Sequence, residues 1–155
     1  MNVLFSVKHQ RGSTMLEVLV TMIIVALGLL GHASLITTSI KANNTAYMRS
    51  QATMLSYDIL ERLRMNRTLA KASSFNITLG SAVPNGATIQ LTELRDWRAN
   101  IAQSLPSGDG SVMVDGSGTA IIVIQWVELV KGSATASTCA DGVATHTCFT
   151  TQSVI

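Results

Sequence analysis

The feature that most constrains this chain is an apolar segment near its N-terminus, which runs from Ser13 to Ile36. Glu17 is its only Asp, Glu, Lys or Arg residue. About 20 predominantly apolar residues are needed to cross a bilayer as a helix, and this segment is long enough. Lys8 and Arg11 precede it, and positive charge on that flank predicts a cytoplasmic N-terminus with the rest of the chain outside.

Two ordinary kinds of membrane-targeting segment, a cleaved secretory signal and an uncleaved signal anchor, share parts of this pattern. A cleaved secretory signal also begins basic and becomes apolar, but this segment is longer than a typical signal core, and no Ala-x-Ala-like site closes it. An uncleaved signal anchor has the right length but leaves Glu17 unexplained. A carboxylate costs about 2.5–3.5 kcal/mol at the bilayer centre, and less near the interface, so we expect Glu17 to have a partner.

The stretch Arg11-Gly12-Ser13-Thr14-Met15-Leu16-Glu17 resembles the processing site of type IV prepilins. The resemblance implies cleavage after Gly12 by a prepilin peptidase and N-methylation of the new terminus at Ser13. It also implies that Glu17, the fifth mature residue, neutralises the terminal amine of a neighbouring subunit during filament assembly. The chain departs from the family pattern at Ser13, where the family usually has Phe.

Helical periodicity continues beyond the apolar segment. Apolar residues recur at spacings of three and four along one helical face: Met48, Ala52, Leu55, Ile59 and Leu63. The sequence therefore predicts four parts, which are a leader (1–12), a transmembrane or filament-core half-helix (13–36), a soluble half of the same helix (37–70) and a globular domain (71–155).

The globular part mixes one short helix with strands. Leu94, Trp97, Ile101 and Leu105 recur at helical spacing and predict a helix from Thr92 to Leu105, with Thr92 as N-cap. Strands are expected at 111–114, 120–130 and 147–155, with a hairpin turn at 115–118. The predicted fold class is α+β, with a long N-terminal helix packed on a small antiparallel sheet.

The globular part of the chain extends the resemblance, because its pattern is similar to that of minor pilins of the PilV type and of type II secretion pseudopilins. It rests on Leu94, Trp97, Leu105-Pro106-Ser107-Gly108, Val123 and Trp126, and on Gly28-Leu29-Leu30-Gly31 in the apolar helix. A minor pilin would be anchored once in the inner membrane, with its C-terminal domain in the periplasm. Its implied partners are the prepilin peptidase, other minor and major pilins, and the inner-membrane assembly platform. A minor pseudopilin of the secretion machine is the alternative.

Two cysteines, Cys139 and Cys148, lie close together in a Ser/Thr-rich tail. This arrangement favours a disulfide formed in an oxidising compartment, and the pilin resemblance implies the same. Zinc binding with His146 is the alternative. The spacing differs from that of the usual close cysteine pairs, and no fourth ligand is evident.

Composition limits the other functional classes. Lys8 and Arg11 precede Gly12 and no acid does, so residues 13–155 carry 9 basic and 9 acidic groups. A chain without net charge gives no strong signal for nucleic-acid binding. Arg95 and Arg98 alone are too few to indicate a nucleic-acid-binding surface.

The sequence nominates neither catalytic residues nor a cofactor. His9, His32 and His146 are far apart in the chain. A signal-anchored periplasmic enzyme or binding protein stays as the alternative from another class. Trp97 and Trp126 are expected in the core, with a surface ring as the alternative.

Overall fold

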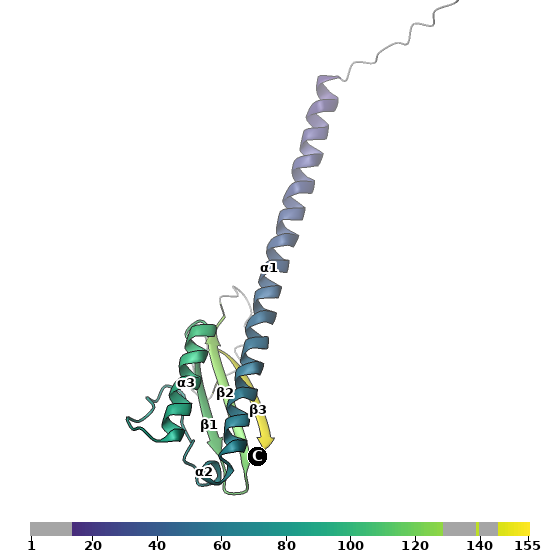
Figure 1. The fold of residues 1–155 in the computed structure, drawn as a ribbon. Coiled ribbons are helices and arrows are strands. Elements are labelled where there is room, and N and C mark those ends of the chain that lie inside the picture. Colours follow the sequence, from purple (N-terminus) through teal and green to yellow (C-terminus); the bar gives the residue numbers. More distant parts are fainter. Residues whose placement is uncertain (1–13, 129–138, 140–145) are drawn as a thin grey trace, which may run out of the picture. The chain divides into compact units, whose positions relative to one another are not determined.

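The computed structural model describes residues 14–128, 139 and 146–155 (Figure 1). The elements along the chain are α1 (Met15–Met65), α2 (Arg67–Lys71), α3 (Ile89–Ser104), β1 (Asp109–Val114), β2 (Thr119–Val127) and β3 (His146–Val154). The chain separates into two compact units, residues 1–40 and 41–155. We describe each unit by itself.

The first unit contains the N-terminal part of α1. Every described residue from Thr14 to Ile40 is exposed, including the large apolar side chains of Leu16, Ile24 and Leu30. The helix is long and apolar enough to cross a membrane, and none of its most apolar stretch is buried within the chain. This part of α1 therefore has the helical structure, length and apolar character that the sequence predicts for a membrane-spanning segment.

The second unit begins with the remainder of α1, which has one buried face. Ala52, Ile59 and Leu63 are fully buried, and Met48 and Leu55 pack partly buried against the same core. The periodic stripe seen in the sequence is thus the face that α1 turns toward the domain.

The expected continuation of this helix to residue 70 is wrong, because α1 ends at Met65. Asn66 has φ −112° and ψ 37°, outside the helical region, and a separate short helix, α2, follows it. The Asn66 side-chain amide donates a hydrogen bond to the Arg62 carbonyl at 3.0 Å. Asparagine side chains compete with the helical backbone in this way, which explains the break.

The short helix of the domain, α3, starts earlier than expected. Its N-cap is Thr88, whose carbonyl accepts the Thr92 amide at 3.1 Å, so the N-cap assignment of Thr92 is wrong. Thr92 lies within the helix, where its hydroxyl also donates to the Thr88 carbonyl. The helix ends before Leu105, which is extended because the following Pro106 disfavours the helical region.

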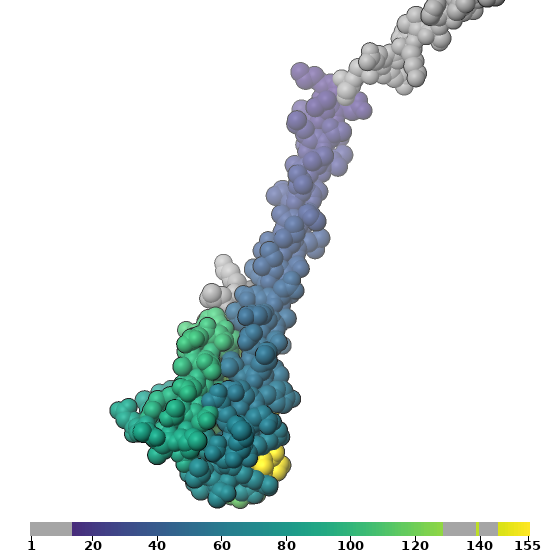
Figure 2. Space-filling view, viewed as in Figure 1, coloured from purple at the N-terminus to yellow at the C-terminus, as the bar shows by residue number. Residues whose placement is uncertain are grey.

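The sheet has three antiparallel strands in the order β1-β2-β3, with β2 in the centre (Figure 1). All three predicted strands are present with shifted ends. One face of the sheet is buried and carries Gly110, Val112, Val114, Ala120, Ile122, Ile124 and Trp126. In the space-filling view α1 and α3 hide most of the sheet (Figure 2). The α+β class is therefore confirmed.

The predicted hairpin turn at residues 115–118 joins β1 to β2. Gly118 has φ +95°, a conformation that glycine adopts without steric cost. The Ser117 hydroxyl and the Thr119 amide donate to the Asp115 carboxylate at 2.6 and 2.8 Å, and these hydrogen bonds lower its pKa. Because this pKa is lowered, the stabilisation exists above the ordinary carboxyl pKa and is lost as pH falls through the folded-state value.

Both tryptophans lie in the core, as predicted. Trp97 of α3 and Trp126 of β2 are almost fully buried, and the Trp97 indole N–H donates to the Leu55 carbonyl of α1 at 2.9 Å. The Trp97 ring lies directly over Gly110 of β1, where a Cβ atom would overlap the ring and would approach Ile101 Cδ1 to 2.7 Å. The close packing of α3 on β1 thus requires glycine at residue 110.

Substituting Gly110→Ala should destabilise the domain by about 1–3 kcal/mol, the usual cost of overpacking a filled core. Gly116→Ala is the matched control, since a Cβ there meets no atom within 4 Å and its φ is not positive. Chemical denaturation of the full chain in detergent, followed by tryptophan fluorescence, measures the unfolding midpoint of each variant. Equal unfolding midpoints for the two variants would contradict the role of Gly110.

Candidate functional site

The first turn of α1 contains Glu17, the residue that the sequence marks for assembly. The Thr14 carbonyl accepts hydrogen bonds from the amides of Glu17, at 3.0 Å, and Val18, at 3.3 Å. The Thr14 hydroxyl also accepts the Glu17 amide, at 3.4 Å. Thr14 therefore caps the helix, a role that our sequence analysis missed although the Thr-x-x-Glu spacing of a capping box signals it.

The position of Glu17 also suits its charge. A carboxylate in the first turn interacts favourably with the partial positive charge of the helix N-terminus. Glu17 is exposed and lies among apolar side chains that no other described element covers. Gly12 and Ser13, the expected cleavage and methylation positions, lie outside the described residues. The described helix therefore begins two residues after the expected new terminus.

Comparison with known protein families gives one match. Residues 7–31 match the prokaryotic N-terminal methylation motif. The matched region includes the basic flank, Gly12, Ser13, Glu17 and the first turns of the apolar helix. Neither the comparison with curated proteins nor that with solved structures finds a match.

The motif and the bare apolar helix together support a type IV pilin-like or pseudopilin-like protein. Such a motif implies processing by a prepilin peptidase and association with a membrane. The folded domain agrees with this class, because a long N-terminal helix packs its second half on a small antiparallel sheet.

The two cysteines are joined, as predicted. Cys139 and Cys148 form a disulfide with their Cα atoms 5.7 Å apart. Cys148 lies in β3 opposite Gln125 of β2, so the disulfide attaches Cys139 to the sheet. Within the described part of the chain, no three His, Cys, Asp or Glu side chains lie close enough to hold a metal ion.

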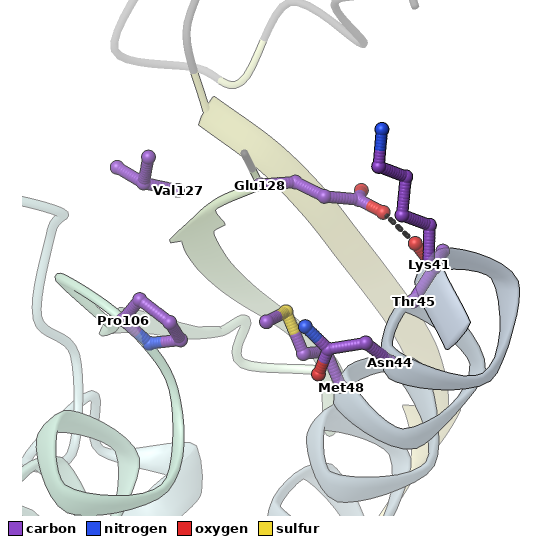
Figure 3. Close-up of a pocket in the computed structure, with 7 residues that line it drawn as sticks. All are labelled: Lys41, Asn44, Thr45, Met48, Pro106, Val127 and Glu128. Atoms are coloured by element: carbon purple, nitrogen blue, oxygen red, sulfur yellow. Dashed lines mark hydrogen bonds between the residues drawn. The ribbon is translucent and has the colours of Figure 1, made fainter. Parts of the chain in front are cut away.

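A small cavity lies where β2 ends beside α1 (Figure 3). Its volume is about 80 Å³, well below the roughly 300–1,000 Å³ of small-molecule sites. The Glu128 carboxylate accepts hydrogen bonds from the Thr45 hydroxyl and, at 3.0 Å, from the Thr147 hydroxyl. Glu128 therefore connects α1, the end of β2 and the start of β3, and the cavity is too small for a ligand site.

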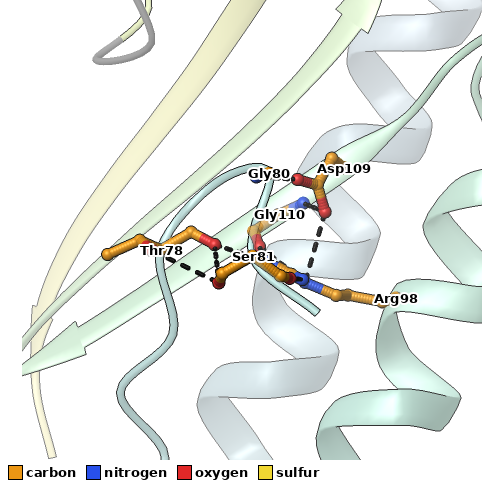
Figure 4. Close-up of polar contacts among 6 residues, drawn as sticks. All are labelled: Thr78, Gly80, Ser81, Arg98, Asp109 and Gly110. Atoms are coloured by element: carbon orange, nitrogen blue, oxygen red, sulfur yellow. Dashed lines mark hydrogen bonds and ion pairs between the residues drawn. The ribbon is translucent and has the colours of Figure 1, made fainter. Parts of the chain in front are cut away.

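A second polar cluster is centred on Arg98 of α3 (Figure 4). Its guanidinium donates to the Gly110 carbonyl at 2.7 and 2.9 Å, to the Thr78 carbonyl at 2.6 Å and to the Ser81 carbonyl. Asp109 lies 3.2 Å from Arg98 Nε and is its ion-pair partner. Partial burial lowers the pKa of Arg98 but leaves it charged.

Arg95, one turn earlier on α3, acts in a similar way. It donates to the Pro84 and Gly86 carbonyls, at 2.9 and 2.5 Å. Both arginines therefore bind backbone oxygens of the segment between the isolated bridge at Ile77 and the start of α3. Their charges hold this segment in place, an arrangement that our sequence analysis did not foresee.

Replacing Arg98 should destabilise the segment around residues 78–81. Arg98→Ala leaves three carbonyl groups and Asp109 without their cation, at a cost of about 2–3 kcal/mol. Arg98→Lys should lose most of this as well, because an ammonium cannot reproduce the planar fork. Limited proteolysis of the full chain should show faster cleavage in this segment. Arg95→Ala, at a more exposed site, is the control with a smaller effect, and equal cleavage of all three variants would refute the assignment.

Proposed function

We propose that this protein is made as a prepilin, cleaved after Gly12 and assembled as a minor pilin of the PilV type into a type IV pilus. The observation that carries the proposal is the methylation motif at residues 7–31, which runs directly into a helix whose described residues to Ile40 are all exposed. A bilayer first stabilises that surface, and a bundle of like helices in a filament later replaces the lipid.

In this proposal Glu17 has an intermolecular role. Cleavage after Gly12 creates an α-amino cation on Ser13, and Glu17 of one subunit neutralises that cation on the next. The attraction is strong because both charges leave water together, and it fixes the axial register of the helices. Ser13 is the site of N-methylation by the same peptidase.

The subunit would be held in the inner membrane by one span, with residues 71–155 in the periplasm, until the assembly platform draws it into the pilus. Other minor and major pilins are its partners, and its role is structural rather than catalytic. The disulfide supports this location, since such bonds persist in the oxidising periplasm. A minor pseudopilin of type II secretion shares these features and serves a different machine.

Processing is the first test of the proposal. Intact-mass and N-terminal analysis of the protein from membranes should give a chain that starts at Ser13 and carries one added methyl group. Cells without prepilin peptidase should contain the chain that starts at Met1, and Gly12→Ala should block cleavage in cells that have the enzyme. An uncleaved chain in all strains would indicate a plain signal anchor and a different function.

Substitutions of Glu17 separate its charge from its place in the capping turn. Glutamine also fits the capping-box position, so Glu17→Gln keeps the backbone hydrogen bonds to Thr14 and removes the charge. We expect Glu17→Gln and Glu17→Ala to be processed normally and to be absent from sheared pili. Normal incorporation of the Gln variant would mean that capping, rather than charge neutralisation, accounts for Glu17. Incorporation is measured by immunoblot of purified filaments from a complemented deletion strain.

A further inference from the structure

The outer edge of β1 is closed by groups of this same chain. Val112 exchanges two backbone hydrogen bonds with Ile77, both at 2.9 Å. Two residues further on, the Asn76 side-chain amide takes the place of a peptide group, accepting from the Val114 amide at 2.8 Å and donating to its carbonyl at 3.2 Å. These two positions of the edge are therefore occupied.

The remaining outward position on β1 is closed as well. The Gly110 carbonyl accepts two hydrogen bonds from Arg98, and the Gly110 amide donates to Asp109 Oδ1 at 2.8 Å. No backbone group on this edge is left for another strand. Natural sheets commonly block an edge in this way to prevent unwanted pairing.

The opposite edge of the sheet is β3, and its hydrogen-bonding direction is fixed by the register. The Ile155 amide donates to the Gly118 carbonyl at 2.9 Å, continuing the pairing of β3 with β2. Backbone groups alternate between the two sides of a strand. The amides and carbonyls of Thr150, Gln152 and Val154 therefore point away from β2.

In the described part of the chain, the only hydrogen bond to a backbone group at these three outward positions is a long one, from the Ser153 hydroxyl to the Val154 carbonyl at 3.4 Å. Thr150, Gln152 and Val154 are exposed, with 68% of Val154 accessible to solvent. The strand HTCFTTQSV contains no Asp, Glu, Lys, Arg or Pro, the residues that usually protect an edge. Three outward backbone amides at a two-residue repeat match the spacing of an extended strand that adds to a sheet edge.

We propose that this edge pairs with β3 of a second copy of the same chain, antiparallel and about a two-fold axis at Gln152. In that register Gln152 faces Gln152 of the other copy in a hydrogen-bonded pair, and Thr150 faces Val154. The contact joins the two sheets into one sheet of six strands, and each copy supplies the same surface.

The chemistry of β3 fits self-pairing. The proposed register places no like charges opposite one another, which would oppose the contact. A Thr–Val pair suits neighbouring strands, and two Gln side chains can exchange amide hydrogen bonds. The proposal does not depend on the pilin assignment, because the edge belongs to the folded domain and would exist in a plain anchored protein.

Cysteine cross-linking of the full chain in detergent tests both partner and register. Directly opposed residues in a hydrogen-bonded pair have Cα atoms about 5.5 Å apart, within disulfide range. Gln152→Cys should therefore form a disulfide-linked homodimer on mild oxidation. Val154→Cys is the control: it is more exposed, but its two copies are displaced by four residues, about 13 Å, and should not cross-link.

A mixture of Thr150→Cys and Val154→Cys chains should give the mixed dimer, which fixes the two-fold register. Mass analysis verifies that Cys139 and Cys148 remain joined. Equal cross-linking of Gln152→Cys and Val154→Cys, or no dimer from either, overturns the proposal. The proposal is also overturned if the Gln152→Cys thiol forms a disulfide within its own chain. The same holds if, in native membranes, this thiol cross-links only to a different protein.

A proline variant tests the backbone bonds themselves. Gln152→Pro removes an amide that points away from β2, so the β2–β3 ladder stays intact, as is usual for edge prolines. It removes both hydrogen bonds of the central pair, which should weaken dimerisation about thirtyfold. Sedimentation of the full chain measures the dimer affinity. The folding control is an unchanged melting temperature at a dilution where both proteins are monomeric, because dimer formation itself raises the melting temperature. A dimer of unaltered affinity would exclude β3 pairing.

Discussion

Apolar side chains cover α1 from Met15 to Ile40, and no described element of the chain shields them from solvent. The hydrophobic effect makes such a surface unstable in water, so the helix needs either lipid or other helices around it. Glu17 is the one charged residue on this stretch, and it lies in the turn where the helix N-terminus favours negative charge. The filament subunit that we propose would need both features, an apolar helical surface for the bilayer and a single carboxylate for contact with a neighbouring subunit.

The same helix has a different pattern in the second unit. From Ala52 to Leu63 only one face is buried, and this face completes the core that α3 and the sheet form. One element thus supplies both the membrane anchor and part of the core of the domain. The Trp97 indole, bonded to the Leu55 carbonyl and lying over Gly110, connects α1, α3 and β1 at one point of that core.

Local patterns predicted the elements of this fold well, because those patterns reflect burial. The stripe from Met48 to Leu63, the strand rich in Ile and Val and the turn at 115–118 all appear where expected. The ends of elements were less predictable. Asn66 breaks the helix through a side-chain hydrogen bond, and α3 gains a first turn whose residues are not part of the apolar stripe.

Long-range polar contacts were beyond the reach of sequence patterns. Arg98 looks like an ordinary surface cation in the sequence, and its partners Thr78, Ser81 and Gly110 come from two other segments. Only the fold brings them together. The candidate site differs, because Glu17 and its flanking residues form a contiguous motif, although our sequence analysis missed the capping role of Thr14 within it.

The difference between the two sheet edges has a consequence for assembly. A sheet that is open on both sides can add strands without limit, which is the route to fibrous aggregation. Here Ile77, Asn76 and Arg98 close the β1 side, so strand addition at β3 uses up the only edge open in the described sheet. Two-fold pairing through β3 therefore ends with two copies. A filament needs contacts that repeat from subunit to subunit, and the two-fold contact at β3 cannot supply them. In the filament that we propose, the repeating contact would therefore come from the apolar helix, and the β3 edge would join chains only in pairs.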